Sequence, residues 1–298
     1  NVGHCNPRVV KAIKEQVDQY MHIMVYGELI ESPQVQYASR IASLLPASLD
    51  AVYFTSSGSE ATEGAIKLAR RVTGKVEIVA AHKSYHGSTL GALSVMGDEY
   101  WRNAFRPLMP GVWHHDYNSE AFLNAINEKT ACVIIEAVQA ESGVHMPDKE
   151  WMQALRKKCS ALGALLIVDE IQTGFGRTGK MWGFEHSDII PDIVLLGKAL
   201  GGGMPLGAFV ASKEHMQQLT NNPVLGHITT FGGHPVSCAA GIAALDVLRE
   251  EQLIEQIEEK SKLFVEALHH EKIKQVRSKG LLIAIELESN DLVLASIQ

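Results

Sequence analysis

The sequence predicts an α/β fold built on a mainly parallel β-sheet, with helices on both faces. Between residues 51 and 206, short apolar runs alternate with segments of helical periodicity. Such alternation is typical of a sheet whose parallel strands are connected by helices. With 298 residues, 46% of them hydrophobic, the chain can bury one large domain and part of another.

The first predicted element is a helix over Pro7 to Tyr20, because Val10, Ile13 and Val17 share one face and Pro7 suits a first helical position. Five apolar runs then form the predicted sheet: Ala51 to Thr55, Val76 to Ala80, Ala131 to Ile135, Ala164 to Val168 and Ile193 to Leu196. In sheets of this kind, ligands bind at the carboxyl ends of the strands.

A second, smaller α+β unit is predicted after Pro235. Residues 239–248 are apolar and small, a helical stripe continues over residues 253–268, and a strand is predicted over Leu281 to Leu287 after Gly280. We expect a large cofactor-binding domain over residues 21–235. The small domain should comprise residues 236–298 together with residues 1–20.

Composition argues against several classes of function. The net charge is −7 and lysine and arginine form no block, so neither nucleic acid nor an anionic membrane is an expected partner. No apolar run approaches the roughly 20 residues of a membrane span, and the first residues do not resemble a signal peptide, so we expect a cytoplasmic protein. Four scattered cysteines predict neither disulfides nor a metal site.

Two charged residues follow successive predicted strands. Asp169 comes directly after the apolar run that ends at Val168, and Lys198 opens a glycine-rich turn after the run that ends at Leu196. A solvated lysine and a turn-capping aspartate are the ordinary alternatives. The apolar and glycine-rich surroundings favour a partly desolvated amine, which is a usable nucleophile.

Two glycine-containing segments are candidate phosphate sites. Residues 56–61, Ser-Ser-Gly-Ser-Glu-Ala, follow the first strand and open a helix, whose free N–H groups suit a phosphate. Helix capping by Ser59 and Thr62 is the alternative. Residues 174–179 fit G-x-G-x-x-G, but they start five residues after the strand and precede no amphipathic helix. A nucleotide site is therefore disfavoured, and a shaped loop is favoured.

These residues, in this order, resemble the pyridoxal-phosphate enzymes of the class III aminotransferase family, which have fold type I. The most specific segments are residues 166–179, Leu-Ile-Val-Asp-Glu-Ile-Gln-Thr-Gly-Phe-Gly-Arg-Thr-Gly, and 197–203, Gly-Lys-Ala-Leu-Gly-Gly-Gly. The resemblance covers nearly the whole chain. It implies pyridoxal 5′-phosphate as cofactor and a small domain that is incomplete at both chain ends.

The resemblance implies a role for each residue around the cofactor ring. Lys198 is similar to the lysine that binds the cofactor as a Schiff base and later moves the substrate proton. Asp169 is similar to the residue that pairs with the pyridine nitrogen, and Gln172 to the one that hydrogen-bonds the phenolic oxygen. Tyr85 resembles the aromatic residue that stacks on the ring, and His86 either holds the cofactor or supports its loop.

The resemblance also implies how the phosphate and the substrate are bound. Ser57, Gly58 and Ser59 match the phosphate loop. Thr230 matches a threonine that reaches the phosphate of the neighbouring subunit, which predicts a homodimer; capping ahead of Pro235 is the alternative. Glu141 matches a glutamate on the substrate side, which in some members pairs with an arginine from the C-terminal part. The sequence offers no clear counterpart of that arginine.

The activity that this resemblance implies is transamination from a terminal amine or ω-amino acid donor to a 2-oxo acid. Glutamate-linked members often carry an arginine where this chain has Ser88, which favours a different way of binding the substrate carboxylate. An aminomutase or decarboxylase of the same family is the nearest alternative. A homologue that retains the fold without catalysis is another, although Lys198 and Asp169 count against it.

Overall fold

The computed structural model describes residues 2–23 and 29–297. Its centre is a seven-stranded sheet of order β1-β7-β6-β5-β4-β2-β3. The strands are β1 (Ala51–Thr55), β2 (Glu77–Ala81), β3 (Val112–His115), β4 (Thr130–Glu136), β5 (Leu165–Asp169), β6 (Ile193–Leu196) and β7 (Gly207–Ala211). Only β7 runs antiparallel to its neighbours, β1 and β6. The predicted α/β fold with a mainly parallel sheet is confirmed.

The five predicted strands of the sheet are all present, with ends shifted by at most one residue. Two strands were not predicted. One is β3, an edge strand with two histidines, an exposed Trp113 and no fully buried residue. The other is β7, which follows the glycine-rich turn and is completely buried between its antiparallel neighbours.

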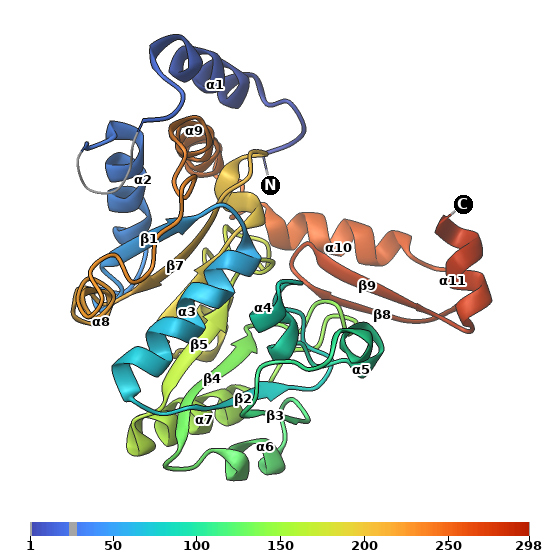
Figure 1. Cartoon of the computed structure of the whole chain (residues 1–298). Coiled ribbons are helices and arrows are strands. Elements are labelled where there is room, and N and C mark those ends of the chain that lie inside the picture. Colours follow the sequence, from blue (N-terminus) through green and yellow to red (C-terminus); the bar gives the residue numbers. More distant parts are fainter. Residues whose placement is uncertain (1, 24–28, 298) are drawn as a thin grey trace.

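Helices cover both faces of the sheet, and alternate strand residues point into two separate hydrophobic cores. In β5, Leu166 and Val168 join one core, whereas Leu165 and Ile167 join the other. The helix α3 (Gly58–Thr73) lies across the second face (Figure 1). Residues of α2 (Ser32–Ala42), α6 (Glu120–Ala125) and α7 (Lys149–Leu162) pack into the first core. Three short helices complete this part: α4 (Leu90–Val95), α5 (Glu99–Arg102) and α8 (Lys213–Gln217).

The N-terminal helix packs against a helix from the second half of the chain. The predicted start of α1 (Pro7–Gln19) at Pro7 is confirmed, and the Asn6 side chain caps it. Val9 of this helix meets Ala240 and Ala244 of α9 (Pro235–Glu250) in a small core. The two helices lie together above the sheet in Figure 1.

The C-terminal segment projects from the sheet as a separate layer (Figure 1). It consists of α10 (Ile257–Ala267), the antiparallel strands β8 (Ile273–Lys279) and β9 (Leu282–Leu287), and α11 (Asn290–Ile297). The predicted helical stripe over residues 253–268 is partly wrong, because residues 251–256 form turns and α10 begins only at Ile257. The strand predicted at Leu281 is found as β9, whereas β8 was not predicted.

The glycine-rich loop over residues 174–179 forms successive turns. Gly176 lies against Ile254, and Gly280 of the β8–β9 turn lies against the backbone of Arg177 and Thr178. The segment therefore shapes a junction between the sheet and the C-terminal layer. Within the described residues, no helix is both long and apolar enough to cross a membrane.

Candidate active site

A cavity of about 180 Å³ opens at the carboxyl ends of β4, β5 and β6. It is lined by Ser57, Gly58, Ser59, Tyr85, His86, Gly87, Glu136, Val138, Asp169, Ile171, Gln172, Thr173 and Lys198. The fold thus brings together nearly all the residues that the sequence singled out, from five loops far apart in the chain. Two predicted residues, Glu141 and Thr230, lie outside this lining.

Lys198 projects into the cavity from a constrained turn. It is separated from the end of β6 by Gly197 alone, opens the short 3-10 helix Lys198–Gly201, and has a φ of 43°. A positive φ is costly for a lysine and is typical of functional positions. Desolvation by the cavity walls lowers the pKa of Lys198, although Glu141, Asp169 and Glu136 act in the opposite direction. A larger share of its amine is therefore in the nucleophilic, neutral form than for a free lysine.

Asp169 is a buried carboxylate held by two hydrogen bonds. Its Oδ1 accepts the N–H of Ile171 at 2.9 Å, and its Oδ2 lies 2.7 Å from Nδ1 of His86. The His86 side chain is completely buried, and its Nε2 has no hydrogen-bond partner among the described residues. The pair fixes the carboxylate in the floor of the cavity, where it can face a ring nitrogen.

The first turn of α3 forms one wall of the cavity. Ser57 caps this helix by accepting the N–H of Glu60 at 3.2 Å, which leaves its hydroxyl hydrogen free to donate. Ser59 accepts the N–H of Ser88 at 3.2 Å. The expected alternative, capping by Ser59, is not what the structure shows, because Ser57 occupies the cap. A 16-residue helix with its N–H groups at the cavity suits a phosphate.

Tyr85 and Gln172 lie on the open side of the cavity. Tyr85 is 40% exposed and lines both this cavity and a neighbouring one. Gln172 donates its side-chain N–H to Glu141 Oε1 at 3.0 Å. The predicted ring-binding glutamine and the predicted substrate-side glutamate are therefore direct neighbours.

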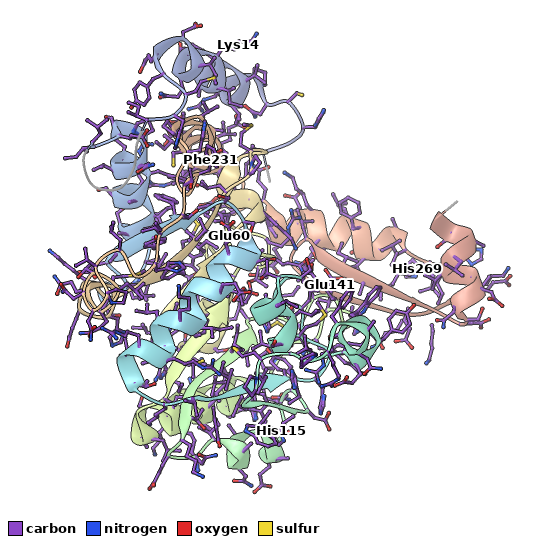
Figure 2. All side chains as sticks on the ribbon, in the orientation of Figure 1. Lys14, Glu60, His115, Glu141, Phe231 and His269 are labelled. Atoms are coloured by element: carbon purple, nitrogen blue, oxygen red, sulfur yellow. The ribbon has the colours of Figure 1, made fainter. Side chains whose placement is uncertain are left out.

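The neighbouring cavity, of about 840 Å³, connects to the first one through Tyr85 and Lys198. Its lining combines apolar and polar side chains: Lys83, Ser84, Ser88, Leu90, Leu93, Met96, Asp98, Trp101, Phe105, Glu141 and Ser142. Figure 2 shows Glu141 on the side of the molecule that faces the β8–β9 hairpin. Lys198 and Tyr85 therefore border both spaces.

Thr230 lies apart from both cavities and is exposed. Apolar side chains of the same chain segment, residues 224–231, are exposed as well, including Val224 at 75%, Ile228 at 51% and Phe231 at 55%. A protein rarely leaves such a group in water unless another surface covers it. Figure 2 places Phe231 beside α9 and α2.

Glu136 is a cavity residue that the sequence analysis did not single out. It ends β4 directly beside Asp169 in the sheet register, and its Oε2 is buried without a hydrogen-bond partner among the described residues. Burial, with the nearby Asp169 charge, raises the pKa of Glu136 well above its ordinary value. The signal was available, since Glu136 is a polar residue at the carboxyl end of a predicted strand.

The family Aminotransferase class-III matches residues 1–296. The chain belongs to this family. It is 42% identical over 295 residues to the acetylornithine aminotransferase of Methanopyrus kandleri, with 97% of this chain and 74% of that protein covered. The fold matches the ornithine aminotransferase of Toxoplasma gondii with a TM-score of 0.88 and 31% identity, over 97% of this chain and 70% of that one. In that structure, pyridoxal phosphate partly occupies the active site.

A further match is the taurine:2-oxoglutarate aminotransferase of Bifidobacterium kashiwanohense in complex with pyridoxal phosphate and glutamate. Its TM-score is 0.89 at 29% identity, over 100% of this chain and 76% of that one. As a class III aminotransferase, the protein uses pyridoxal 5′-phosphate to pass an amino group from an amino donor to a 2-oxo acid. The predicted family, fold, activity and cofactor are confirmed.

The cavity of this aminotransferase fits the cofactor. An anionic phosphate needs N–H and hydroxyl donors, which the first turn of α3 and Ser57 supply. A protonated pyridine nitrogen needs a buried anion, which Asp169 provides. The carbonyl carbon of the cofactor needs an amine, and Lys198 lies in the same lining. Val138 and Ile171 add apolar walls for the ring.

A buried glutamate behind Asp169 makes the stability of this aminotransferase depend on pH. Glu170 accepts hydrogen bonds from Thr173, Gly183 and Phe184, and burial raises its pKa to about 7. The folded protein therefore retains a proton that the unfolded chain releases above its pKa of 4.5. The stability that this proton gives the folded protein is fully present below pH 4.5 and is lost as the pH rises through 7.

We expect a loss of stability on the order of 3 kcal/mol from this residue between pH 4.5 and 8. Denaturant unfolding of the wild type and of Glu170→Gln, measured across that pH range, gives the slope of the unfolding free energy against pH for each protein. At pH 4.5 the variant is less stable than the wild type, because the amide cannot accept all the hydrogen bonds. Its unfolding free energy should then lack the decrease with pH that comes from Glu170. Identical slopes in the two proteins would show that Glu170 does not hold the proton.

Proposed function

We propose that this aminotransferase binds pyridoxal phosphate covalently through Lys198, with Asp169 at the ring nitrogen and the first turn of α3 at the phosphate. The observation that carries the proposal is the placement of Lys198 and Asp169 in one cavity, at the carboxyl ends of neighbouring strands. The two residues are 29 positions apart in sequence, and the pairing of β5 with β6 brings them close together in space.

Each side chain then has a defined task. The bound cofactor supplies an electron-accepting ring, which needs a protonated nitrogen. Asp169, oriented by His86, keeps that proton in place. Lys198, with its lowered pKa, removes the proton from the substrate carbon and returns it to the cofactor side. Tyr85 would cover one face of the bound ring, and Gln172 would donate a hydrogen bond to its phenolic oxygen.

Donors with a terminal amine are the substrates that we propose. Two observations support this: relatives at 42% identity are acetylornithine aminotransferases, and the large cavity beside Lys198 combines apolar walls with the carboxylate of Glu141. Glu141 lies on the substrate side, where it would contact either the amino donor or the residue that binds the carboxylate of that donor. Ser88 lines the same cavity in place of an arginine, so the substrate carboxylate is bound elsewhere.

The test is a spectroscopic donor panel. The holoenzyme is mixed with acetylornithine, ornithine, 4-aminobutyrate or taurine, without an acceptor, and the visible absorption of the bound cofactor is followed. We expect at least one ω-amino donor to remove this absorption and a 2-oxo acid to restore it. Cofactor absorption that none of these ω-amino donors removes, or that no 2-oxo acid restores, would contradict the proposal.

We further propose a homodimer in which Thr230 reaches the partner's phosphate site. The exposed apolar side chains around Thr230 support an interface there. The predicted division into residues 21–235 and a small domain of 236–298 with 1–20 stays a prediction. A cytoplasmic location is supported by the buried free thiols of Cys132, Cys159 and Cys238, which are typical of reducing compartments.

Replacing Thr230 by alanine is expected to weaken cofactor binding about tenfold, because one hydrogen bond to a charged phosphate is lost. Cofactor affinity is measured by titrating the apoprotein, and the dimer is measured by sedimentation. Thr220→Ala is the matched control, since the hydrogen bonds of the Thr220 hydroxyl stay within its own turn: it donates to the Gln217 carbonyl at 2.7 Å and accepts from the Asn221 side-chain N–H at 3.1 Å. Equal affinities of the two variants, or a monomer with full cofactor affinity, would rule out the shared site.

A further inference from the structure

The loop that carries Glu141 is closed at its base and bent at its tip. Gln139 and His145 exchange two backbone hydrogen bonds, of 3.0 and 2.9 Å, which close the loop. At the tip, Gly143 has a φ of 112° and Val144 a φ of 59°. Glycine adopts a positive φ freely, but a β-branched residue such as Val144 keeps it only where its surroundings hold it.

The conformation of this loop sets the position of the Glu141 carboxylate. Glu141 bonds Gln172 at 3.0 Å and lines the substrate-side cavity together with Lys198. Its side chain is exposed, so few packing contacts fix it directly. The backbone of the loop is therefore the main constraint on where the carboxylate lies.

One side chain from the C-terminal hairpin reaches this loop. Arg277, in β8, donates its Nε–H to the carbonyl oxygen of Gly143 at 2.6 Å. The approach is close: a Cβ on Gly143 would lie 2.7 Å from Arg277 Nη2. A charged donor makes this hydrogen bond stronger than one between neutral groups.

The hairpin itself is held in place on both sides of Arg277. Glu286 of β9 accepts from Arg277 Nη1 at 2.7 Å and also pairs with Lys274, which lowers the pKa of Glu286 to about 2. At the hairpin turn, Leu281 donates its N–H to the Arg177 carbonyl at 2.9 Å, which anchors the turn to the glycine-rich loop. Arg277 thus connects an anchored strand to the tip of the Glu141 loop.

We infer that Arg277 is a positioning residue for the amino donor: it holds the Gly143 carbonyl, and through it the Glu141 loop, in the conformation that binds substrate. Arg277 acts on the loop backbone. The inference rests on the substrate-side role proposed above for Glu141. The C-terminal hairpin then contributes to substrate binding through Arg277 and does not contribute to cofactor attachment.

The test compares Arg277→Gln with Lys274→Gln in the holoenzyme. Both substitutions remove one cation from β8 and one partner from Glu286, but only Arg277 contacts the Glu141 loop. We expect Arg277→Gln to raise the apparent dissociation constant of the amino donor about tenfold in the half-reaction. The affinity for pyridoxal phosphate and the melting temperature should match those of Lys274→Gln.

A direct readout of the loop is amide hydrogen exchange in peptides that cover residues 139–145. We expect faster exchange there in Arg277→Gln than in Lys274→Gln, because the loop backbone loses its support. Arg277→Lys, which can still pair with Glu286 but lacks the Nε donor, provides a second variant if Arg277→Gln does not fold. It should fall between Arg277→Gln and the wild type.

A Glu141→Gln background separates the role of Glu141 from that of Arg277. If Arg277 acts through Glu141, adding Arg277→Gln to that background changes donor binding by less than about twofold. Unchanged donor binding in Glu141→Gln alone would overturn the proposed role of Glu141 and this inference with it. A defect in Glu141→Gln, combined with an Arg277→Gln that binds donor as Lys274→Gln does, would overturn the inference alone.

Discussion

Replacing Lys198 by alanine is expected to reduce the transamination rate by at least about 10²- to 10⁴-fold, the range that a positioned acid–base group contributes. The variant loses both the amine that attaches the cofactor and the base that moves the substrate proton. Steady-state assays with an ω-amino donor and a 2-oxo acid measure the rate, and borohydride trapping measures the covalent attachment.

The control for this experiment is Lys213→Ala, in α8, which lies outside the lining of both cavities. It should retain the full rate and the full visible absorption of the bound cofactor. The account would be wrong about Lys198 if Lys198→Ala kept a borohydride-reducible cofactor and a rate within tenfold of the wild type.

The second large effect is expected from Asp169→Asn, which keeps the shape of the side chain but removes its charge. The ring nitrogen then loses its anionic partner, and we expect a rate loss of roughly 10²- to 10³-fold, as for other removed electrostatic groups in active sites. The amide can still hydrogen-bond Ile171, so the local backbone should be preserved. The rate of the half-reaction at saturating donor isolates this effect from donor binding.

Asp192→Asn is the matched comparison, because Asp192 lies at the amino end of β6, away from the cavity at the carboxyl ends, and pairs with Arg156 at 2.6 Å. It should lower the stability of the protein while leaving the rate per folded enzyme unchanged. Asp169→Glu should recover part of the rate, since it restores the charge. If Asp169→Asn and Asp192→Asn gave equal rates, the pairing of Asp169 with the ring nitrogen would be refuted.

The part of the fold that could be predicted is the part with a strong local pattern. Apolar runs such as those ending at Val168 and Leu196 are uniformly hydrophobic and bounded by polar or glycine residues, so their strands were located to within one residue. The β7 strand was missed because it closely follows the glycine-rich turn and Pro205, and because one of its two partners, β1, is distant in sequence. Its existence depends on tertiary pairing, which local patterns do not encode.

The same distinction applies to the site. Lys198 and Asp169 could be found because both follow predicted strands, where parallel sheets place their ligands. The link between Arg277 and Gly143 had no such signal, since a side chain there bonds a backbone carbonyl 134 residues away in sequence. The contact of Gln172 with Glu141 likewise depends on two loops meeting above the sheet.

The attachment of pyridoxal phosphate to Lys198 is tested most directly by peptide mapping. The holoenzyme is reduced with borohydride and digested, and the peptide that carries the reduced cofactor is sequenced by mass spectrometry. The account predicts a single modified residue, Lys198. Modification of another lysine, such as Lys83 in the neighbouring cavity, or a folded holoenzyme with no modified lysine, would contradict it.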